Sequence, residues 1–169
     1  MELNWLKPDW DSGLPIHMLP LTKLRDKGIK GLILDVDGTL LSGRSVALQT
    51  DVLNWLNEAK ESFHLHLLSN NPSEERIRLV ANQLMVDYTF KALKPRRKKI
   101  TQVCQKINED NMDLALIGDR IFTDVIGGNR LGLYTVLVKP IAKGRIIESK
   151  LLVQGLERTL SKLLGVNLL

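Results

Sequence analysis

Strand-length apolar runs alternate with helix-length amphipathic segments along this chain from residue 31 onward. The expected strands span residues 31–36, 63–68, 86–90, 113–117 and 134–138. The expected helices span residues 46–60, a segment that opens at Pro72-Ser73-Glu74-Glu75, and residues 96–108, 123–131 and 146–164. Alternation of this kind favours a parallel sheet with helices on both faces. We therefore predict an α/β fold, a doubly wound three-layer parallel sheet with five core strands.

The 169 residues are enough for one domain with a substantial hydrophobic core. We divide it into an N-terminal arm (1–28), a core (29–140) and a C-terminal helix (141–169). No stretch approaches the roughly 18 apolar residues that a membrane span needs. The N-terminus lacks the basic-then-apolar plan of a signal peptide. The one cysteine, Cys104, excludes an internal disulfide and fits a reducing compartment, so we expect a cytoplasmic protein.

Two carboxylates follow the first predicted strand in the motif Asp35-Val36-Asp37-Gly38-Thr39-Leu40. Open α/β sheets bind their ligands at the carboxyl ends of their strands. Two carboxylates about 5 Å apart repel by roughly 3 kcal/mol at an effective dielectric near 20. This cost becomes bearable if Mg²⁺ lies between them or if one acid stays protonated. A protonated Asp37 would suit the role of a general acid.

Polar motifs also end the next three strands. They are Ser69-Asn70-Asn71, Lys94-Pro95 and the run Gly118-Asp119-Arg120-Ile121-Phe122-Thr123-Asp124. A parallel sheet brings all these strand ends to one edge. Phosphoryl transfer needs an in-line nucleophile, a proton donor for the leaving oxygen, and cations or donors that neutralise the phosphoryl oxygens. Carboxylates, a hydroxyl and a lysine meet that list, with Mg²⁺ as the metal that prefers hard oxygen ligands.

The ordered set of motifs resembles the haloacid dehalogenase (HAD) superfamily over roughly residues 29–140. More narrowly, Asn70-Asn71, Lys94-Pro95, the run 118–132 and the N-terminal Leu6-Lys7-Pro8-Asp9 are similar to the YqeG-type subfamily IIIA phosphatases, which resemble phosphatidylglycerophosphate phosphatases. This sequence departs from that subfamily at Gly38 and Arg120, where Asn and Gln are common. The resemblance implies a Mg²⁺-dependent phosphatase that works through an aspartyl-phosphate.

The resemblance also implies a role for each matching residue. Asp35 would be the nucleophile and a Mg²⁺ ligand, and Asp37 the general acid/base, with its backbone carbonyl on Mg²⁺. Asp119 would bind Mg²⁺ and Asp124 would support the metal. The phosphoryl group would be bound by Ser69, Asn70 and Lys94. Lys94 would also neutralise the charge of the nucleophile.

Taken singly, these residues have ordinary structural explanations. Lone acids at such positions are most often turn or cap residues, and Lys91 competes with Lys94 for its role. The two histidines of the second strand, His64 and His66, are expected to be structural, and Cys104 is expected to be a small buried hydrophobe. A receiver domain combines similar residue types, but here the third strand ends without an acid, which disfavours it.

The intervals between the motifs leave no room for a cap domain, because each is filled by a helix and a strand of the core. By resemblance, capless members have open sites and act on large or surface-bound phosphates. The resemblance implies phosphatidylglycerophosphate as the substrate, and the basic run 94–99 suits contact with an anionic membrane at its inner face. For the N-terminal arm and the C-terminal helix we favour packing on the sheet over membrane contact. The apolar face of that helix includes Ile147, Leu151, Leu152, Leu156, Leu160 and Leu163.

Two alternatives remain at this stage. One is a phosphatase of a soluble or nucleotide phosphate. The other is a non-catalytic basic module that binds RNA or anionic membrane, an option that the net charge of +5 permits. Because such a module has no need of the four motifs together, we expect a phosphorylated substrate and no nucleic-acid partner. The oligomeric state does not follow from the sequence.

Overall fold

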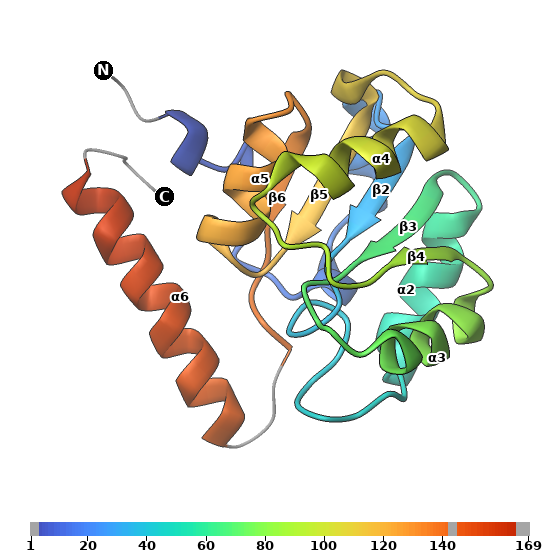
Figure 1. The fold of residues 1–169 in the computed structure, drawn as a ribbon, viewed down its shortest axis with the longest axis horizontal. Coiled ribbons are helices and arrows are strands. Elements are labelled where there is room, and N and C mark those ends of the chain that lie inside the picture. The colour runs from blue at the N-terminus through green and yellow to red at the C-terminus, as the bar shows by residue number, and fades with distance from the viewer. Residues whose placement is uncertain (1–3, 142–144, 165–169) are drawn as a thin grey trace.

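A six-stranded parallel sheet forms the centre of the molecule, and Figure 1 shows helices around it. The computed structural model describes the backbone of residues 4–141 and 145–164, and the side chains of residues 5–141 and 151–164. The strands are β1 (Trp10–Asp11), β2 (Gly31–Leu34), β3 (His64–Leu68), β4 (Asp87–Thr89), β5 (Leu114–Gly118) and β6 (Tyr134–Leu137). Their order across the sheet is β1-β6-β5-β2-β3-β4.

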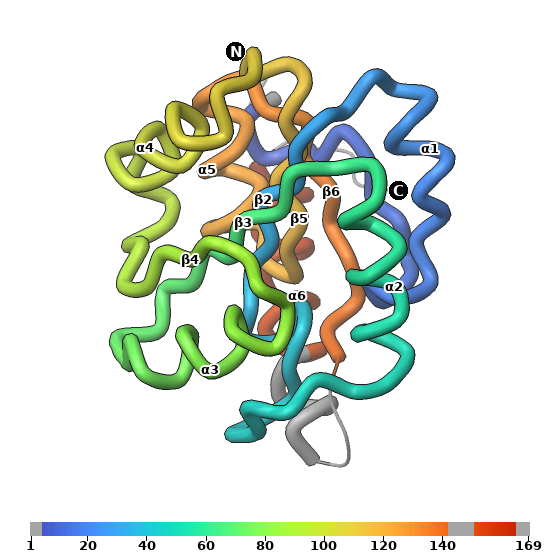
Figure 2. Tube along the Cα trace, turned by 90° about the vertical axis from the view of Figure 1, so that its right-hand side faces the viewer, coloured from blue at the N-terminus to red at the C-terminus, as the bar shows by residue number. Residues whose placement is uncertain are grey.

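The helices lie on both faces of this sheet. The α-helices are α1 (Leu21–Asp26), α2 (Thr50–Lys60), α3 (Glu74–Leu84), α4 (Arg97–Ile107), α5 (Ile126–Asn129) and α6 (Arg145–Leu163). The short helical turns are η1 (Asn4–Leu6), η2 (Ile16–Met18), η3 (Asn111–Asp113) and the π-helical turn η4 (Ile121–Val125). Figure 2 shows α1 and α2 on one side of the strands and α4 and α5 on the other. The predicted three-layer α/β class is confirmed.

The hydrophobic core is divided by the sheet. The larger cluster joins the inner faces of α1, α2 and α3 to the sheet, and a second cluster places Ile100, Val103 and Cys104 of α4 against Leu116. All four residues of β2 are buried, as expected for a central parallel strand. Cys104 is buried in the second cluster, which agrees with its expected structural role.

Local signals set the ends of the helices. Ser73 caps α3 by accepting a hydrogen bond from the Arg76 amide, and Glu74 and Glu75 lie in the first turn. The same helix ends at Met85, which adopts a left-handed conformation with a φ of 53°. Helix α4 likewise ends at a left-handed residue, Asn108, a residue type that tolerates this conformation. These stops let β4 and β5 begin shortly afterwards.

The N-terminal arm packs on the sheet and adds a strand that we had not predicted. Strand β1 pairs with β6, so the sheet has six strands rather than five. Asp9 holds the arm in place, because its carboxylate accepts hydrogen bonds from both the amide and the hydroxyl of Thr135. A two-residue strand without an apolar run carries no periodic signal, which explains the omission. The favoured prediction for the arm, packing on the core, is correct, with Leu6 fully buried.

Two predicted helices differ in extent from the observed ones. The helix expected at 46–60 begins at Thr50, because residues 42–49 form a loop, and the helix expected at 123–131 is replaced by η4 followed by the short α5. Between β2 and α2, and between β3 and α4, the described chain contains only core elements and loops, so no cap domain is inserted there. None of the described helices has both the length and the hydrophobicity to cross a membrane.

The burial of His66 predicts that the stability of the protein depends on pH. Its side chain is buried in β3 beside the Thr89 hydroxyl, and burial lowers the pKa of this imidazole to about 4. The unfolded chain therefore binds a proton between about pH 6.5 and pH 4 that the folded chain excludes. We expect the free energy of unfolding to fall by about 2 kcal/mol from this group between pH 7 and pH 5, as measured by urea denaturation. His66→Gln removes this contribution, whereas His64→Gln, at an exposed position of the same strand, keeps it. Equal pH dependence in His66→Gln and the parent protein contradicts the assignment.

Candidate active site

Four predicted site segments meet at the carboxyl edge of the sheet. Asp35 follows β2, Ser69 follows β3, Lys94 lies in the loop between β4 and α4, and Asp119 follows β5. The central strands are in register, with Leu34 of β2 opposite residues of both β3 and β5. Because the strands are parallel and adjacent, residues far apart in the chain line one hollow. The expectation that these motifs share one edge is met.

Lys94 is buried between two acids. Its ammonium lies 2.7 Å from Asp35 Oδ1 and 2.7 Å from Asp124 Oδ1, and donates to the Leu68 carbonyl at 2.9 Å. Burial by itself lowers the pKa of Lys94, but the attraction of Asp124 and Asp35 outweighs burial and raises it above its ordinary value. The competitor Lys91 is exposed and does not take this place.

Asp35 occupies an environment that shifts its proton affinity. Its carboxylate accepts hydrogen bonds from the Thr39 hydroxyl and the Lys94 ammonium. Burial raises the pKa of Asp35 to about 6 and the Asp124 carboxylate adds to the rise, while Lys94 opposes it. One ammonium cannot neutralise two carboxylates, so the site favours a further cation or a shared proton.

Three acids form a cluster that fits a metal ion. One ligand oxygen each from Asp35, Asp119 and Asp124 lies within 4.8 Å of the others, and all three residues are buried. Carboxylate oxygens are the hard ligands that Mg²⁺ takes in proteins. Gly118 makes the cluster possible, because a Cβ built there would lie 2.3 Å from the Asp124 carboxyl. The side chain of Asp37, the fourth predicted ligand residue, is outside this cluster, and the role of its carbonyl remains a prediction.

Asp37 is held by donors from two other segments. Its Oδ2 accepts from the Ser69 hydroxyl at 3.2 Å and from Nδ2 of the Asn71 side chain at 3.1 Å. Its Oδ1 accepts two hydrogen bonds from Arg76, from Nε at 3.2 Å and from Nη2 at 2.9 Å. The next residue, Gly38, has a φ of 108°, which side chains disfavour; this explains glycine at the first departure from the subfamily pattern.

Arg76 is a site residue that the sequence analysis missed. It lies in the first turn of α3, and its guanidinium also donates to the carbonyls of Gly43 and Arg44. One side chain therefore joins Asp37 to Gly43 and Arg44, farther along the loop between β2 and α2. No motif or spacing marks this arginine, because its importance arises only when α3 folds against that loop.

The side chain of Asn70 fixes the backbone of Lys94. The Asn70 side chain accepts from the Lys94 amide at 2.7 Å and donates to the Lys94 carbonyl at 3.1 Å. The amide of Asn70 therefore serves the loop that carries Lys94 in this structure. Ser69 is buried, and its hydroxyl also accepts from the backbone amide of Asn71. This hydroxyl faces Asp37 at the edge of the hollow.

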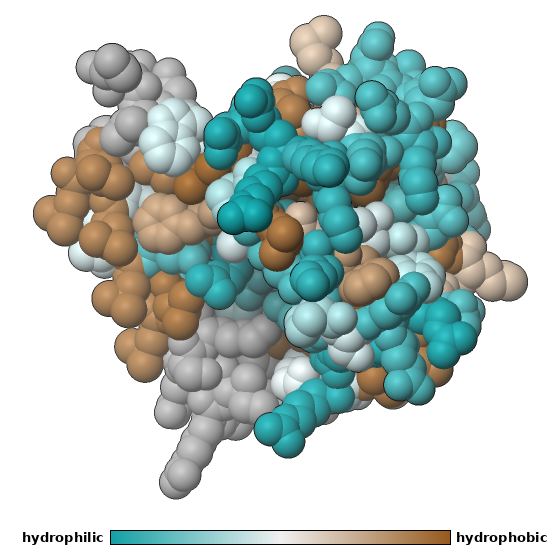
Figure 3. All heavy atoms as spheres, viewed as in Figure 1, coloured by the Kyte–Doolittle hydropathy of each residue, from teal (hydrophilic) through white to brown (hydrophobic). Residues whose placement is uncertain are grey.

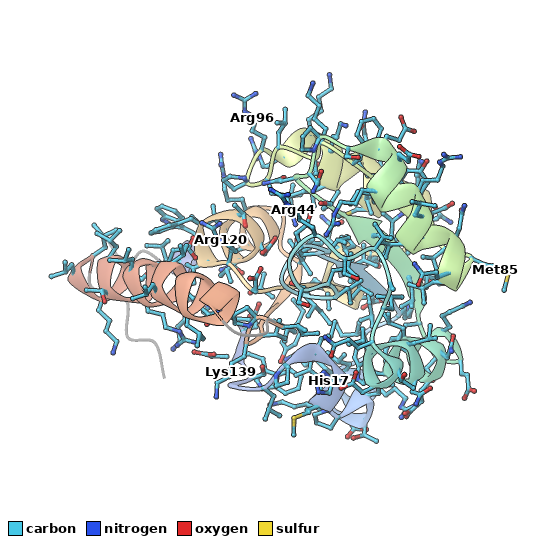
Figure 4. All side chains as sticks on the ribbon, turned by 90° about the horizontal axis from the view of Figure 1, so that it is seen from below. His17, Arg44, Met85, Arg96, Arg120 and Lys139 are labelled. Atoms are coloured by element: carbon cyan, nitrogen blue, oxygen red, sulfur yellow. The ribbon has the colours of Figure 1, made fainter. Side chains whose placement is uncertain are left out.

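The guanidinium of Arg120, the second departure from the subfamily pattern, is paired with α6. Figure 4, seen from below, shows Arg120 close to α6. Its guanidinium donates to Glu157 Oε1 from Nε at 2.9 Å and from Nη2 at 2.8 Å. The sequence analysis also missed Glu157 and Gln154, which bind this segment from α6. In the sequence, Gln154 and Glu157 stand out only as polar residues within an otherwise leucine-rich helix.

The hollow itself is small. It has a volume of about 150 Å³ and is lined by the residues Asp35, Asp37, Ser69, Asn70, Asn71, Lys94, Asp119, Arg120 and Thr123. Each of these side chains carries a charge or a hydrogen-bonding group. A phosphoryl group fits such a volume, whereas the rest of a larger substrate would extend outside it.

Comparison with known proteins supports the resemblance stated above. A family described as mitochondrial PGP phosphatase matches residues 12–142. The "Probable phosphatase YqeG" of Bacillus subtilis is 35% identical over 127 residues, which cover 75% of this chain and 73% of that protein. "Phosphatidylglycerophosphate phosphatase 1, chloroplastic/mitochondrial" of Arabidopsis thaliana is 28% identical over 129 residues, which cover 71% of this chain and 37% of that protein.

Solved structures share the fold at low sequence identity. A Legionella pneumophila protein described as a subfamily IIIA hydrolase of the HAD superfamily has a TM-score of 0.53 and 16% identity, covering 85% of this chain and 95% of that one. An uncharacterised protein from Listeria monocytogenes has a TM-score of 0.55 and 15% identity, covering 75% of this chain and 99% of that one. These likenesses support the α/β architecture.

Gly118 tests the acidic cluster. A methyl group at this position meets the Asp124 carboxyl, so Gly118→Ala is expected to displace that acid. We expect Mg²⁺ affinity, measured by titration calorimetry, to fall by roughly 10-fold to 100-fold, the range seen when groups supporting a metal are disturbed. Gly155→Ala is the matched control, since nothing lies within 4 Å of its added Cβ. Unchanged Mg²⁺ affinity in folded Gly118→Ala protein contradicts the assignment of the metal to this cluster.

Arg76 tests the positioning of Asp37. Arg76→Gln removes the paired hydrogen bonds to Asp37, so we expect kcat for p-nitrophenyl phosphate to fall by roughly 10-fold to 100-fold while KM changes little. Arg76→Lys is expected to restore only part of the rate, because an ammonium cannot donate in the same forked geometry. The control is Arg78→Gln, at an exposed position on the same helix. A loss confined to KM would show that Arg76 binds substrate instead.

Proposed function

This chain belongs to the family described as mitochondrial PGP phosphatase, within the HAD-type phosphatases, and on that premise we propose a Mg²⁺-dependent phosphatase that hydrolyses phosphatidylglycerophosphate through an aspartyl-phosphate. The enzyme class, phosphoric monoester hydrolase, follows from family membership. The metal, the intermediate and the lipid substrate are the proposal. The arrangement of Asp35, Lys94 and Asp124 in one buried triad is the observation that carries it.

In the proposed first step, a carboxylate oxygen of Asp35 attacks phosphorus in line and forms an acyl-phosphate bond. The phosphorus–oxygen bond to the alcohol breaks, and Asp37 delivers a proton to the leaving oxygen. In the second step, Asp37 removes a proton from water, which attacks the same phosphorus and releases inorganic phosphate from Asp35. The contacts of Arg76 and Ser69 to Asp37 support this assignment, because they hold its carboxyl at the edge of the hollow.

Lys94 provides fixed positive charge next to the nucleophile. Its ammonium is 2.7 Å from Asp35 and is expected to attract the oxygens of the transferred group as charge develops on them. In our proposal Ser69 and Asn70 bind the phosphoryl group. Asn70 is expected to act mainly through the loop of Lys94, since both of its amide atoms bind the backbone of that residue.

Mg²⁺ would be held by Asp35, Asp119 and Asp124, whose oxygens lie within 4.8 Å of one another. When bound, such an ion neutralises phosphoryl oxygens and orients the group for attack. Lys94 already bridges two of these acids, so the protein's own residues hold the cluster together.

The shape of the site supports a large substrate. The hollow accommodates a phosphoryl group, and the described chain contains no cap over it. A small metabolite would be poorly shielded from water in such a site, whereas a lipid headgroup can be presented by a membrane. The relative from Arabidopsis thaliana is described as a phosphatidylglycerophosphate phosphatase, which supports the same substrate class. We also propose a cytoplasmic location with peripheral contact to an anionic membrane.

A soluble or nucleotide phosphate is the second candidate substrate, because the open hollow accommodates only the phosphoryl group. A non-catalytic basic module is no longer favoured, since the chain belongs to a phosphatase family.

A substrate panel tests the proposal. With Mg²⁺ present, we expect a higher kcat/KM for phosphatidylglycerophosphate in mixed micelles than for glycerol 3-phosphate or a nucleoside monophosphate. Chelation of Mg²⁺ is expected to abolish phosphate release, and re-addition to restore it. Asp35→Asn is expected to lower kcat by at least about four orders of magnitude, whereas Asp26→Asn, at an exposed site on α1, keeps it. Activity in Asp35→Asn overturns the mechanism, and a preference for a soluble ester favours the second candidate.

A further inference from the structure

Helix α6 presents its apolar face to solvent. Leucines cover the outer side of the helix, and three of them are strongly exposed: Leu152 at 67%, Leu156 at 63% and Leu163 at 79%. Figure 3 shows this apolar surface along α6 at one margin of the molecule. The expectation that this face of the C-terminal helix packs on the sheet is therefore wrong for the leucines at 151, 152, 156, 160 and 163; Ile147 lies outside the described side chains.

The opposite, polar face of α6 makes the contact with the protein. Gln154 donates to the carbonyls of Asp119 and Val138, at 2.8 and 3.0 Å. Glu157, which is 3% exposed, accepts from Arg120 and from the Ile121 amide. These hydrogen bonds fix which side of the helix faces inward, because turning it would leave buried polar groups without partners.

A second ion pair fastens the same face to the edge of the sheet. Arg158 binds the Asp11 carboxylate of β1 through both terminal nitrogens, at 2.6 and 2.8 Å. Ser161 is fully buried on this face. The outward leucines are therefore a consequence of specific contacts on the inner side. A contiguous apolar face of this kind marks a surface that binds another apolar phase.

Charge identifies the partner of this face. Residues 139–169 contain six basic residues, Lys139, Lys143, Arg145, Lys150, Arg158 and Lys162, and two acidic ones, Glu148 and Glu157. Glu157 is paired with Arg120 and Arg158 with Asp11. Apart from these two pairs, the sequence of the segment holds five basic residues and one acidic residue together with its leucines. This is the composition of a helix that lies in the interface of an anionic bilayer.

A second copy of this helix fits the leucine pattern less well. A coiled-coil seam through Val153, Leu156, Leu160 and Leu163 has the alternating spacing of three and four residues, but it uses only part of the apolar face. Helix α6 has 19 residues, fewer than the roughly three to four heptads typical of a sustained coiled coil. The apolar face is also wider than this seam, because the exposed Leu151, Leu152 and Leu164 lie outside it.

We infer that the outer face of α6 is a docking surface for an anionic lipid bilayer, with its leucines in the acyl–headgroup boundary. The inference deepens the proposed function, on which it rests for the lipid nature of the substrate. Docking would bring the site close to the membrane, because α6 binds Asp119, Arg120 and Ile121 at the carboxyl edge of the sheet. Trp5, 42% exposed in η1, is a further interfacial side chain, since η1 and α6 both pack against η4.

Vesicle binding by the full-length chain tests the inference. Asp35→Asn protein is mixed with vesicles of phosphatidylcholine, with or without phosphatidylglycerol, and bound protein is measured by flotation. We expect stronger binding to the vesicles that contain phosphatidylglycerol, and weakening of that binding by salt. Leu152→Gln combined with Leu156→Gln is expected to lower the partition coefficient by roughly tenfold or more, without changing net charge.

The matched control removes exposed apolar side chains elsewhere. Leu79→Gln combined with Met112→Gln changes residues that are 43% and 79% exposed on other elements, and binding should remain. Circular dichroism confirms folding of both double variants. Equal vesicle binding by the Leu152/Leu156 variant and the parent, or absence of binding by the parent, overturns the inference. A parent dimer that this variant dissociates, without vesicle binding, assigns the face to a second copy and also overturns it.

Activity separates this inference from the proposed function. The Leu152/Leu156 variant is expected to keep its rate on p-nitrophenyl phosphate and to lose rate on vesicle-borne phosphatidylglycerophosphate. If the parent binds vesicles but does not hydrolyse this lipid, the proposed substrate fails and the docking surface stands. If it hydrolyses the lipid in micelles but does not bind vesicles, the docking surface fails and the substrate stands.

Discussion

The site depends on one buried cation. Lys94 lies between Asp35 and Asp124, and its ammonium ties the end of β2 to the turn η4. Removing one partner of a buried ion pair costs about 3–5 kcal/mol, because the remaining charge is left without compensation. The surrounding structure is arranged around this constraint: Asn70 fixes the backbone of Lys94, and Gly118 leaves space for the Asp124 carboxyl. Three strand ends are thereby held in a single electrostatic unit.

Most of this arrangement could be predicted because it follows from periodicity and topology. Alternating strands and helices imply a parallel sheet, and a parallel sheet brings residues such as Asp35 and Asp119 to one edge whatever their separation in the chain. Lys94 and Lys91 were both available from the sequence, and burial decided between them. The short strand β1 had no such signal, since two residues show no period and the pairing with β6 is made through tertiary contacts such as Asp9 to Thr135.

The missed residues share a physical reason. Arg76, Gln154 and Glu157 act through side chains that reach across to other elements, so their partners are set by how α3 and α6 dock. A sequence reveals which face of a helix is apolar, and the usual inference is that this face packs inward. In α6 the inference fails, because the inner contact is made by specific hydrogen bonds and ion pairs, as in the pairing of Arg158 with Asp11.

The polar contact of α6 links the proposed docking surface to the acids of the site. Gln154 binds the backbone of Asp119 and Glu157 binds the backbone of Ile121, the residues immediately before and after Arg120. A helix held in this way cannot shift along the sheet without disturbing the loop that supplies Asp119 to the acidic cluster. The buried carboxylate of Glu157 also makes release of the helix costly, because a charge removed from its partners must be resolvated or left unpaired. A membrane-facing helix with a polar inner side can therefore hold an open site at a defined place beside a lipid surface. A helix attached to the protein by its leucines alone could not do so, because those leucines would be buried against the core and could not contact the lipid.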